Sequence, residues 1–222
     1  MEIDDSAKLE FLEIGAARGD AELCVILMHG LGADGYDFED LAELLCRTAL
    51  PKRWRIVLPH ATELPVTINM GVRMPAWYDI LGLSHPREVN WETVEASTSK
   101  IESLIATEPA GKLILAGFSQ GAAMALHVGL RNPSKVSAVA MMSGYLLESD
   151  ERPVPPLESD LPIGIFHGSA DEVVPFQAAE MTLQALSAAG YAPTFKPYPG
   201  LAHSVSDEEI RDLFQWLLKH GL

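Results

Sequence analysis

Short apolar runs alternate with amphipathic segments along this chain, and that alternation limits its fold more than any other feature. The runs typical of buried strands, each ended by a glycine or proline signal, are Leu23–Met28, Arg55–Leu58, Leu113–Ala116, Val136–Met142 and Pro162–Phe166. Weaker candidates are Leu9–Ile14 and Thr194–Tyr198. Because strands that alternate with helices pair mainly in parallel and are covered on both faces, we predict an α/β fold with a mostly parallel central sheet flanked by helices.

Residues with helical periodicity fill the intervals between these runs. The predicted helices are Tyr36–Arg47, Thr93–Thr107, Gln120–Arg131, Val174–Ala189 and a C-terminal helix from about Asp207 to Lys219. The last begins with Ser206 and Glu209, whose S-x-x-E spacing is that of a capping box. Residues 59–87 instead contain four prolines and little periodicity, and so long a loop in a compact domain is often functional. Since ligands collect at the carboxyl ends of parallel strands, a site is expected directly after the runs.

Length, charge and cysteine content restrict the class of protein. A chain of 222 residues can bury about 70% of its unfolded surface, so we expect a single domain over residues 1–222. The net charge of −15 argues against binding to nucleic acid or to anionic membranes, since both rest on lysine and arginine. The two cysteines show no C-x-x-C or clustered Cys/His spacing, so they predict reduced thiols and give no sign of a metal site.

The beginning of the chain bears on its location. The sequence MEIDDSAKLE is acidic and lacks the apolar core of a secretory signal. Glu2 stands where N-myristoylation needs a glycine, and no apolar run approaches the roughly 18–20 residues that cross a bilayer. We therefore expect a cytoplasmic protein with no stable membrane anchor.

The stretch 115-LAGFSQGAAM-124 places Ser119 between Gly117 and Gly121, after a predicted strand and directly before a predicted helix. A strand, G-x-S-x-G and a helix form the nucleophile elbow of α/β-hydrolases. Strained backbone angles lift such a serine above the sheet edge, and the glycines allow strand and helix to approach closely. The Gln120 amide, at the helix N-terminus, is then free to bind developing negative charge. The alternative, a plain turn flanked by glycines, is disfavoured by the strand before it and the helix after it.

A serine hydroxyl needs a base, and in this fold the order along the chain is serine, acid, histidine. Only His203 and His220 follow the plausible acid region, and His220 lies at the end of the last helix. His203 precedes that helix in a loop that can reach over the sheet edge, so we assign it as the base. For the acid we prefer Asp171 to Glu172, because the valines that follow indicate that Glu172 already turns towards helix packing.

A second oxyanion donor is expected in the loop after an early strand. The segment 28-MHGLGADGYDF-38 is rich in glycine, which lets the backbone bend and expose amides, and Leu31 is the predicted donor. His29 precedes the acid in the chain, so we expect it to brace this loop through hydrogen bonds instead of acting in catalysis.

The segments HGLGADGYDF, 74-MPAWYD-79, GFSQGAAMAL, 167-HGSADEVVP-175 and the late GLAHSV together resemble the phospholipase/carboxylesterase family, which includes the acyl-protein thioesterases. The similarity spans nearly the whole chain. It implies an α/β-hydrolase fold with little or no cap domain, and hydrolysis of carboxylic esters, with thioesters or lysophospholipids as substrates of some members. Carried over by residue, Ser119, Asp171 and His203 match the triad, and Leu31 and Gln120 match the oxyanion donors. Trp77 matches a pocket-side tryptophan.

These assignments predict a serine carboxylesterase that forms an acyl-enzyme and needs no cofactor. The expected partner is a small-molecule ester with a short to medium acyl chain, since no long cap is evident. We expect an apolar pocket with walls from Leu31, Met70, Met74, Trp77 and Val173. Acyl-protein thioesterase or lysophospholipase activity is an alternative main reaction. A peptidase on the same fold, or a ligand-binding protein without catalysis, also stays open, as does a homodimer formed through the rim of the pocket.

Overall fold

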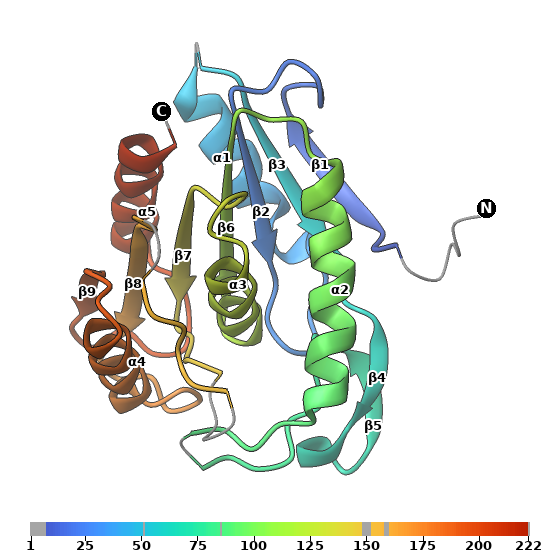
Figure 1. The fold of residues 1–222 in the computed structure, drawn as a ribbon, viewed down its shortest axis with the longest axis vertical. Helices are drawn as coiled ribbons and strands as arrows, with labels where there is room; N and C mark the ends of the chain where they lie inside the picture. Colours follow the sequence, from blue (N-terminus) through green and yellow to red (C-terminus); the bar gives the residue numbers. More distant parts are fainter. Residues whose placement is uncertain (1–7, 51, 85, 148–151, 158–159, 222) are drawn as a thin grey trace.

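The computed structural model describes residues 8–50, 52–84, 86–147, 152–157 and 160–221, so the expectations drawn from residues 1–7 lie outside it. Its main strands are β1 (Phe11–Gly15), β2 (Leu23–Met28), β3 (Trp54–Pro59), β6 (Lys112–Phe118), β7 (Ala138–Met142), β8 (Ile163–Gly168) and β9 (Thr194–Tyr198). They form a seven-stranded sheet in the order β1-β3-β2-β6-β7-β8-β9 (Figure 1). Only β1 runs antiparallel to its neighbour in this sheet, so the predicted α/β fold with a mostly parallel sheet is confirmed.

Helices cover both faces of the sheet (Figure 1). The helices are α1 (Glu39–Ala49), α2 (Trp91–Thr107), α3 (Gln120–Arg131), α4 (Phe176–Ala188) and α5 (Asp207–His220). Strand β2 shows how the two cores arise: Val25 and Leu27 pack with α1 and α5, whereas Ile26 and Met28 pack with α2, α3 and α4. Because side chains of a strand alternate between faces, a continuous apolar run supplies both cores.

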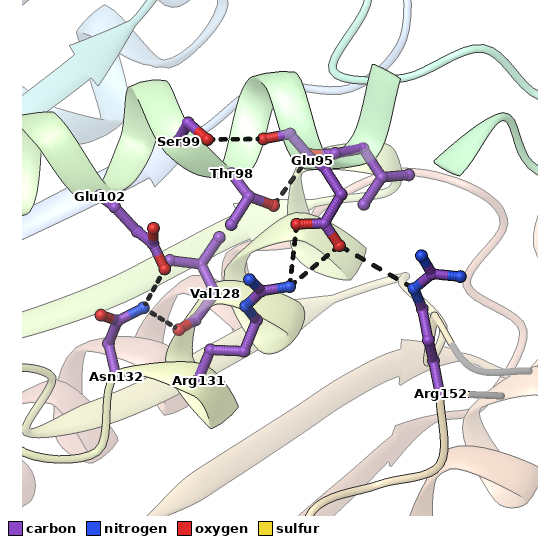
Figure 2. Close-up of polar contacts among 9 residues, drawn as sticks. Glu95, Thr98, Ser99, Glu102, Val128, Arg131, Asn132 and Arg152 are labelled. Atoms are coloured by element: carbon purple, nitrogen blue, oxygen red, sulfur yellow. Dashed lines mark hydrogen bonds and ion pairs between the residues drawn. The ribbon is translucent and has the colours of Figure 1, made fainter. Parts of the chain in front are cut away.

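Polar side chains join α2 to α3 on the outer surface (Figure 2). Arg131 Nη1 lies 3.0 Å from both carboxylate oxygens of Glu95, and Arg152 Nε lies 4.0 Å from Oε1 of the same residue. Asn132 Nδ2 donates to Glu102 Oε1 at 2.9 Å. Exposed ion pairs of this kind contribute about 0–1 kcal/mol each, so the apolar core, and not this cluster, holds the two helices on the sheet.

Several predicted boundaries shift for local reasons. The helix predicted from Tyr36 begins as a 3₁₀ turn, η2 (Gly35–Phe38), because the Asp34 carboxylate caps the Tyr36 amide, and α1 follows it. At α5, the Ser206 hydroxyl accepts from the Glu209 amide as predicted, at 3.2 Å. The reciprocal half of the capping box does not form, since neither carboxylate oxygen of Glu209 has a hydrogen-bond partner among the described residues.

The proline-rich stretch from 59 to 87 contains a hairpin that its sequence did not reveal. Strands β4 (Glu63–Val66) and β5 (Val72–Pro75) pair antiparallel through the short 3₁₀ turn η3 (Thr67–Asn69). Four-residue strands that contain proline give almost no alternation signal. Residues 76–80 follow this hairpin and are buried, and Trp77 and Tyr78 bond to Gln120, just beyond the carboxyl end of β6. No helix within the described parts of the chain is long and apolar enough to span a membrane.

Candidate active site

The serine corner lies between the end of β6 and the beginning of α3. Ser119 has φ 55° and ψ −118°, a conformation that is strained for a residue with a side chain. A Cβ atom on Gly117 would lie 2.3 Å from the Gly121 carbonyl carbon, and one on Gly121 would lie 2.3 Å from the Met28 carbonyl oxygen. Glycine is therefore required at both positions for the strand and helix to approach, as the G-x-S-x-G pattern predicts.

The structure brings Ser119, His203 and Asp171 together. His203 Nε2 lies 3.0 Å from Ser119 Oγ, and His203 Nδ1 lies 2.6 Å from Asp171 Oδ2. An ionised carboxylate only accepts hydrogen bonds, so Nδ1 carries the proton and Nε2 of the neutral ring is free to accept from the serine hydroxyl. The arrangement can thus remove a proton from the serine.

The loop between β8 and α4 fixes the carboxylate. Asp171 Oδ1 accepts from the amides of Val173 and Val174 at 2.9 and 2.8 Å, which leaves Oδ2 for His203. Helix α4 begins at Phe176, later than predicted, because Pro175 is its N-cap and has an extended ψ of 141°. Glu172, the rejected alternative, is exposed.

Two aromatic side chains that pack around the triad were given no catalytic role from the sequence. His167 is fully buried below the carboxylate, with Nε2 2.8 Å from the Val174 carbonyl oxygen and 3.5 Å from Asp171 Oδ2. Burial lowers the pKa of His167, so its neutral ring donates from Nε2 to this carbonyl. Phe118 packs against His203 with ring centroids 4.7 Å apart. The sequence signal for His167 was its position four residues before Asp171. Nothing in the sequence marks Phe118 as part of the site.

The glycine-rich loop after β2 lies against the serine. A Cβ atom on Gly30 would be 3.5 Å from the Ser119 Cβ. As expected, His29 braces this loop: Nδ1 donates to the Gly30 carbonyl at 2.7 Å, and Nε2 accepts from the Ala61 amide at 3.0 Å. Burial lowers the pKa of His29, which keeps the ring neutral and preserves this pairing.

Two backbone amides beside the serine are available to a ligand. Among the backbone hydrogen bonds of the described residues outside helices and strands, none uses the Leu31 amide. Gln120 is the first residue of α3, so no carbonyl of that helix can accept from its amide. Two free donors next to a nucleophile are what an oxyanion needs.

Of the residues predicted to line the pocket, three lie near the serine or the acid loop and Met70 does not. Leu31 is partly buried, Met74 lies beside the loop with its sulfur 3.7 Å from a Cβ placed on Gly32, and Val173 is 57% exposed in the acid loop. The structure does not bring Met70 to the site, because it occupies a left-handed turn at the hairpin tip and is 94% exposed.

Trp77 also departs from its predicted place. It is fully buried, its indole N–H donates to the His29 carbonyl at 2.9 Å, and its ring therefore presents no surface to a substrate. Within the described ranges, no group of three or more His, Cys, Asp or Glu side chains is placed to hold a metal ion.

Known proteins share this sequence and fold. A family model described as Phospholipase/Carboxylesterase matches residues 9–221. Acyl-protein thioesterase 1 of Neurospora crassa is 36% identical over 200 residues, which cover 84% of this chain and 82% of that protein. Its counterpart in Gibberella zeae is 34% identical over 209 residues, covering 88% and 89%. The crystal structure of Zea mays acyl-protein thioesterase 2 superposes with a TM-score of 0.79 at 27% identity, over 96% of this chain and 99% of that one. The chain therefore belongs to the phospholipase/carboxylesterase family, with the α/β-hydrolase fold.

Proposed function

We propose that this protein is a serine esterase that hydrolyses carboxylic esters and thioesters, with Ser119 as nucleophile, His203 as general base and Asp171 as the supporting acid. One observation carries the proposal: the unbroken chain of contacts from Asp171 Oδ2 through His203 to Ser119 Oγ, with lengths of 2.6 and 3.0 Å. The family to which the chain belongs supports the reaction class.

In the first step Ser119 Oγ attacks the acyl carbon while His203 Nε2 takes its proton. Asp171 keeps the proton on Nδ1 and stabilises the imidazolium, without itself being protonated. When the tetrahedral intermediate collapses, the alcohol or thiol leaves with the proton from His203, and the acyl group stays on the serine. Water then attacks the acyl carbon while His203 Nε2 takes its proton, which forms the second tetrahedral intermediate. This intermediate collapses by breaking the bond to Ser119 Oγ: the carboxylic acid leaves, and His203 returns the proton to Oγ to restore the free hydroxyl.

The negative charge of both tetrahedral intermediates falls on the former carbonyl oxygen. The amides of Leu31 and Gln120 are the donors proposed for it. Gln120 directly follows Ser119, and Leu31 follows Gly30, where an added Cβ would lie 3.5 Å from the Ser119 Cβ. Loss of one such donor typically lowers turnover by about 10²–10³.

The substrate is proposed to be an acyl ester or thioester with a short to medium acyl chain. Relatives named as acyl-protein thioesterases support thioesters as well as oxygen esters. Leu31, Met74 and Val173 offer the apolar surface for the acyl group.

The test compares p-nitrophenyl esters and S-acyl thioesters of increasing chain length on the wild type, Ser119→Ala and Ser134→Ala, where Ser134 is an exposed control. Wild type and Ser134→Ala should turn over both substrate types and react with a fluorophosphonate, whereas Ser119→Ala should lose at least about 10³-fold in turnover and all labelling. Turnover by Ser119→Ala within tenfold of the wild type, or no turnover by the wild type, would refute the proposal. Peptide-bond cleavage faster than ester cleavage would indicate the peptidase alternative.

A further inference from the structure

The residues that follow β5 are buried between the serine corner and the glycine-rich loop, and the side chain of Gln120 holds them there. Gln120 Oε1 accepts from the Trp77 amide at 2.9 Å, and Gln120 Nε2 donates to the Tyr78 carbonyl at 2.7 Å. All three residues are at most 1% exposed. A carboxamide has both an acceptor and a donor, so it can satisfy an amide and a carbonyl of the same segment, which neither a carboxylate nor an alkyl chain can do.

This segment in turn holds the loop that carries the Leu31 amide. The Trp77 indole N–H donates to the His29 carbonyl at 2.9 Å, and the two rings lie 5.1 Å apart. The Gly32 amide donates to the Pro75 carbonyl at 2.9 Å. His29 and Gly32, which precede and follow Leu31, are therefore both bonded to residues 75–77. These bonds fix the position and the orientation of the Leu31 amide.

A buried tryptophan in this fold does not need an indole partner. Trp54 and Trp216 are 1% and 6% exposed, and their Nε1 atoms have no hydrogen-bond partner in the described part of the chain. The bond from Trp77 is thus not a general requirement of packing here. It joins the two segments that supply the proposed oxyanion donors, since Gln120 contributes one donor amide and Trp77 connects Gln120 to the loop of the other.

We propose that the Gln120 carboxamide and the Trp77 indole N–H are positioning groups that fix the Leu31 amide relative to the Gln120 amide. This inference rests on the proposed esterase function. Neither side chain touches the reacting atoms. Their effect is on the geometry of the two donors, which matters most when charge develops on the substrate oxygen in the transition state.

The test is Trp77→Phe, which keeps an apolar ring and removes the N–H, with Trp54→Phe as a matched control that removes an unpartnered indole. For a short p-nitrophenyl ester, Trp77→Phe should lower kcat about 10- to 100-fold with KM within about threefold, since a misplaced donor weakens the transition state more than the ground state. A trifluoromethyl ketone, which forms a tetrahedral oxyanion on the serine, should bind more weakly by the same factor as kcat falls. Trp54→Phe should keep both constants within about threefold.

Gln120→Met extends the test, because it keeps the donor amide and the side-chain length but removes both bonds to the segment. It should show the same selective loss of kcat and of ketone affinity. Urea unfolding of each variant separates loss of folding from loss of alignment. Wild-type kcat in Trp77→Phe, or a change in KM alone, would overturn the inference. The proposed function is judged separately: if Ser119→Ala kept its activity, that function would fail, whereas an inactive Ser119→Ala with an unaffected Trp77→Phe would reject only the positioning role.

Discussion

Glu209 should make this protein less stable as the pH rises from about 4.5 to 7. The residue lies in the first turn of α5, is fully buried, and has no hydrogen-bond partner for either carboxylate oxygen among the described residues. Burial raises the pKa of its carboxyl from 4.5 to about 7. At 1.36 kcal/mol per unit, ionising this group in the folded state costs about 3 kcal/mol relative to the unfolded chain.

The sign follows from where the proton binds more tightly. Below about pH 4.5 both states hold the proton, and the buried carboxyl carries no penalty. Between about 4.5 and 7 the unfolded chain has released its proton and the folded one has not, so the free energy of unfolding falls as pH rises. Above about pH 7 the whole penalty is present.

Glu209→Gln removes the titration and keeps the shape of the side chain. The difference in the free energy of unfolding between the variant and the wild type should grow by about 3 kcal/mol in favour of the variant from pH 5 to pH 9. Urea unfolding followed by tryptophan fluorescence measures this difference. Glu208→Gln, which makes the same charge change at an exposed position of the same turn, is the control and should show a nearly constant difference. Other buried groups titrate equally in the wild type and the variant, so their contributions cancel in the difference between the two free energies of unfolding. A difference between Glu209→Gln and wild type that stays flat across this pH range would refute the reasoning.

Three further substitutions test other parts of the structure. Asp171→Asn should lower kcat about 10⁴-fold, because the amide favours the wrong tautomer of the base, while the exposed Glu172→Gln should leave the same ester assay unchanged. Gly121→Ala should destabilise by about 3 kcal/mol or more in urea unfolding, since its Cβ would meet a backbone oxygen at 2.3 Å; unfolding like that of wild type would contradict the close approach at the elbow. Met70→Ala should leave the acyl chain-length profile unchanged, because this side chain is exposed. A shifted optimum would show that Met70 contacts the acyl chain after all.

The predictable parts of this protein are those set by residues close together in the chain. The corner at Ser119 follows from adjacent signals, and α3 begins and ends where its periodicity predicts. Strands β2 and β9 also match their predicted bounds, because turn signals stop each run at both ends. The order serine, acid, histidine placed Asp171 and His203 correctly near each other because strand order in such a sheet is itself regular.

The unpredicted parts depend on partners far away in the sequence. Trp77 was expected at the surface of a pocket, but its backbone amide and its indole N–H donate to residues 43 and 48 positions away, and no local pattern reveals that these residues converge. Met70 was placed by apolarity alone, whereas its left-handed backbone at the end of η3 sends it to solvent. Glu209 looked like half of a capping box, and only packing decided that its carboxyl enters the core.

The double use of Asp171 has a consequence for how the chain tolerates length changes. One oxygen of Asp171 accepts from the two amides in the turn before α4, and the other accepts from the His203 ring, so one side chain fixes both this turn and the orientation of the base. With a residue inserted between 171 and 174, the Asp171 carboxylate could no longer accept from both valine amides and from His203 at the same time. Insertions are better accommodated at open turns such as those at Gly19 and Gly111, where even an added side chain would contact nothing within 4 Å.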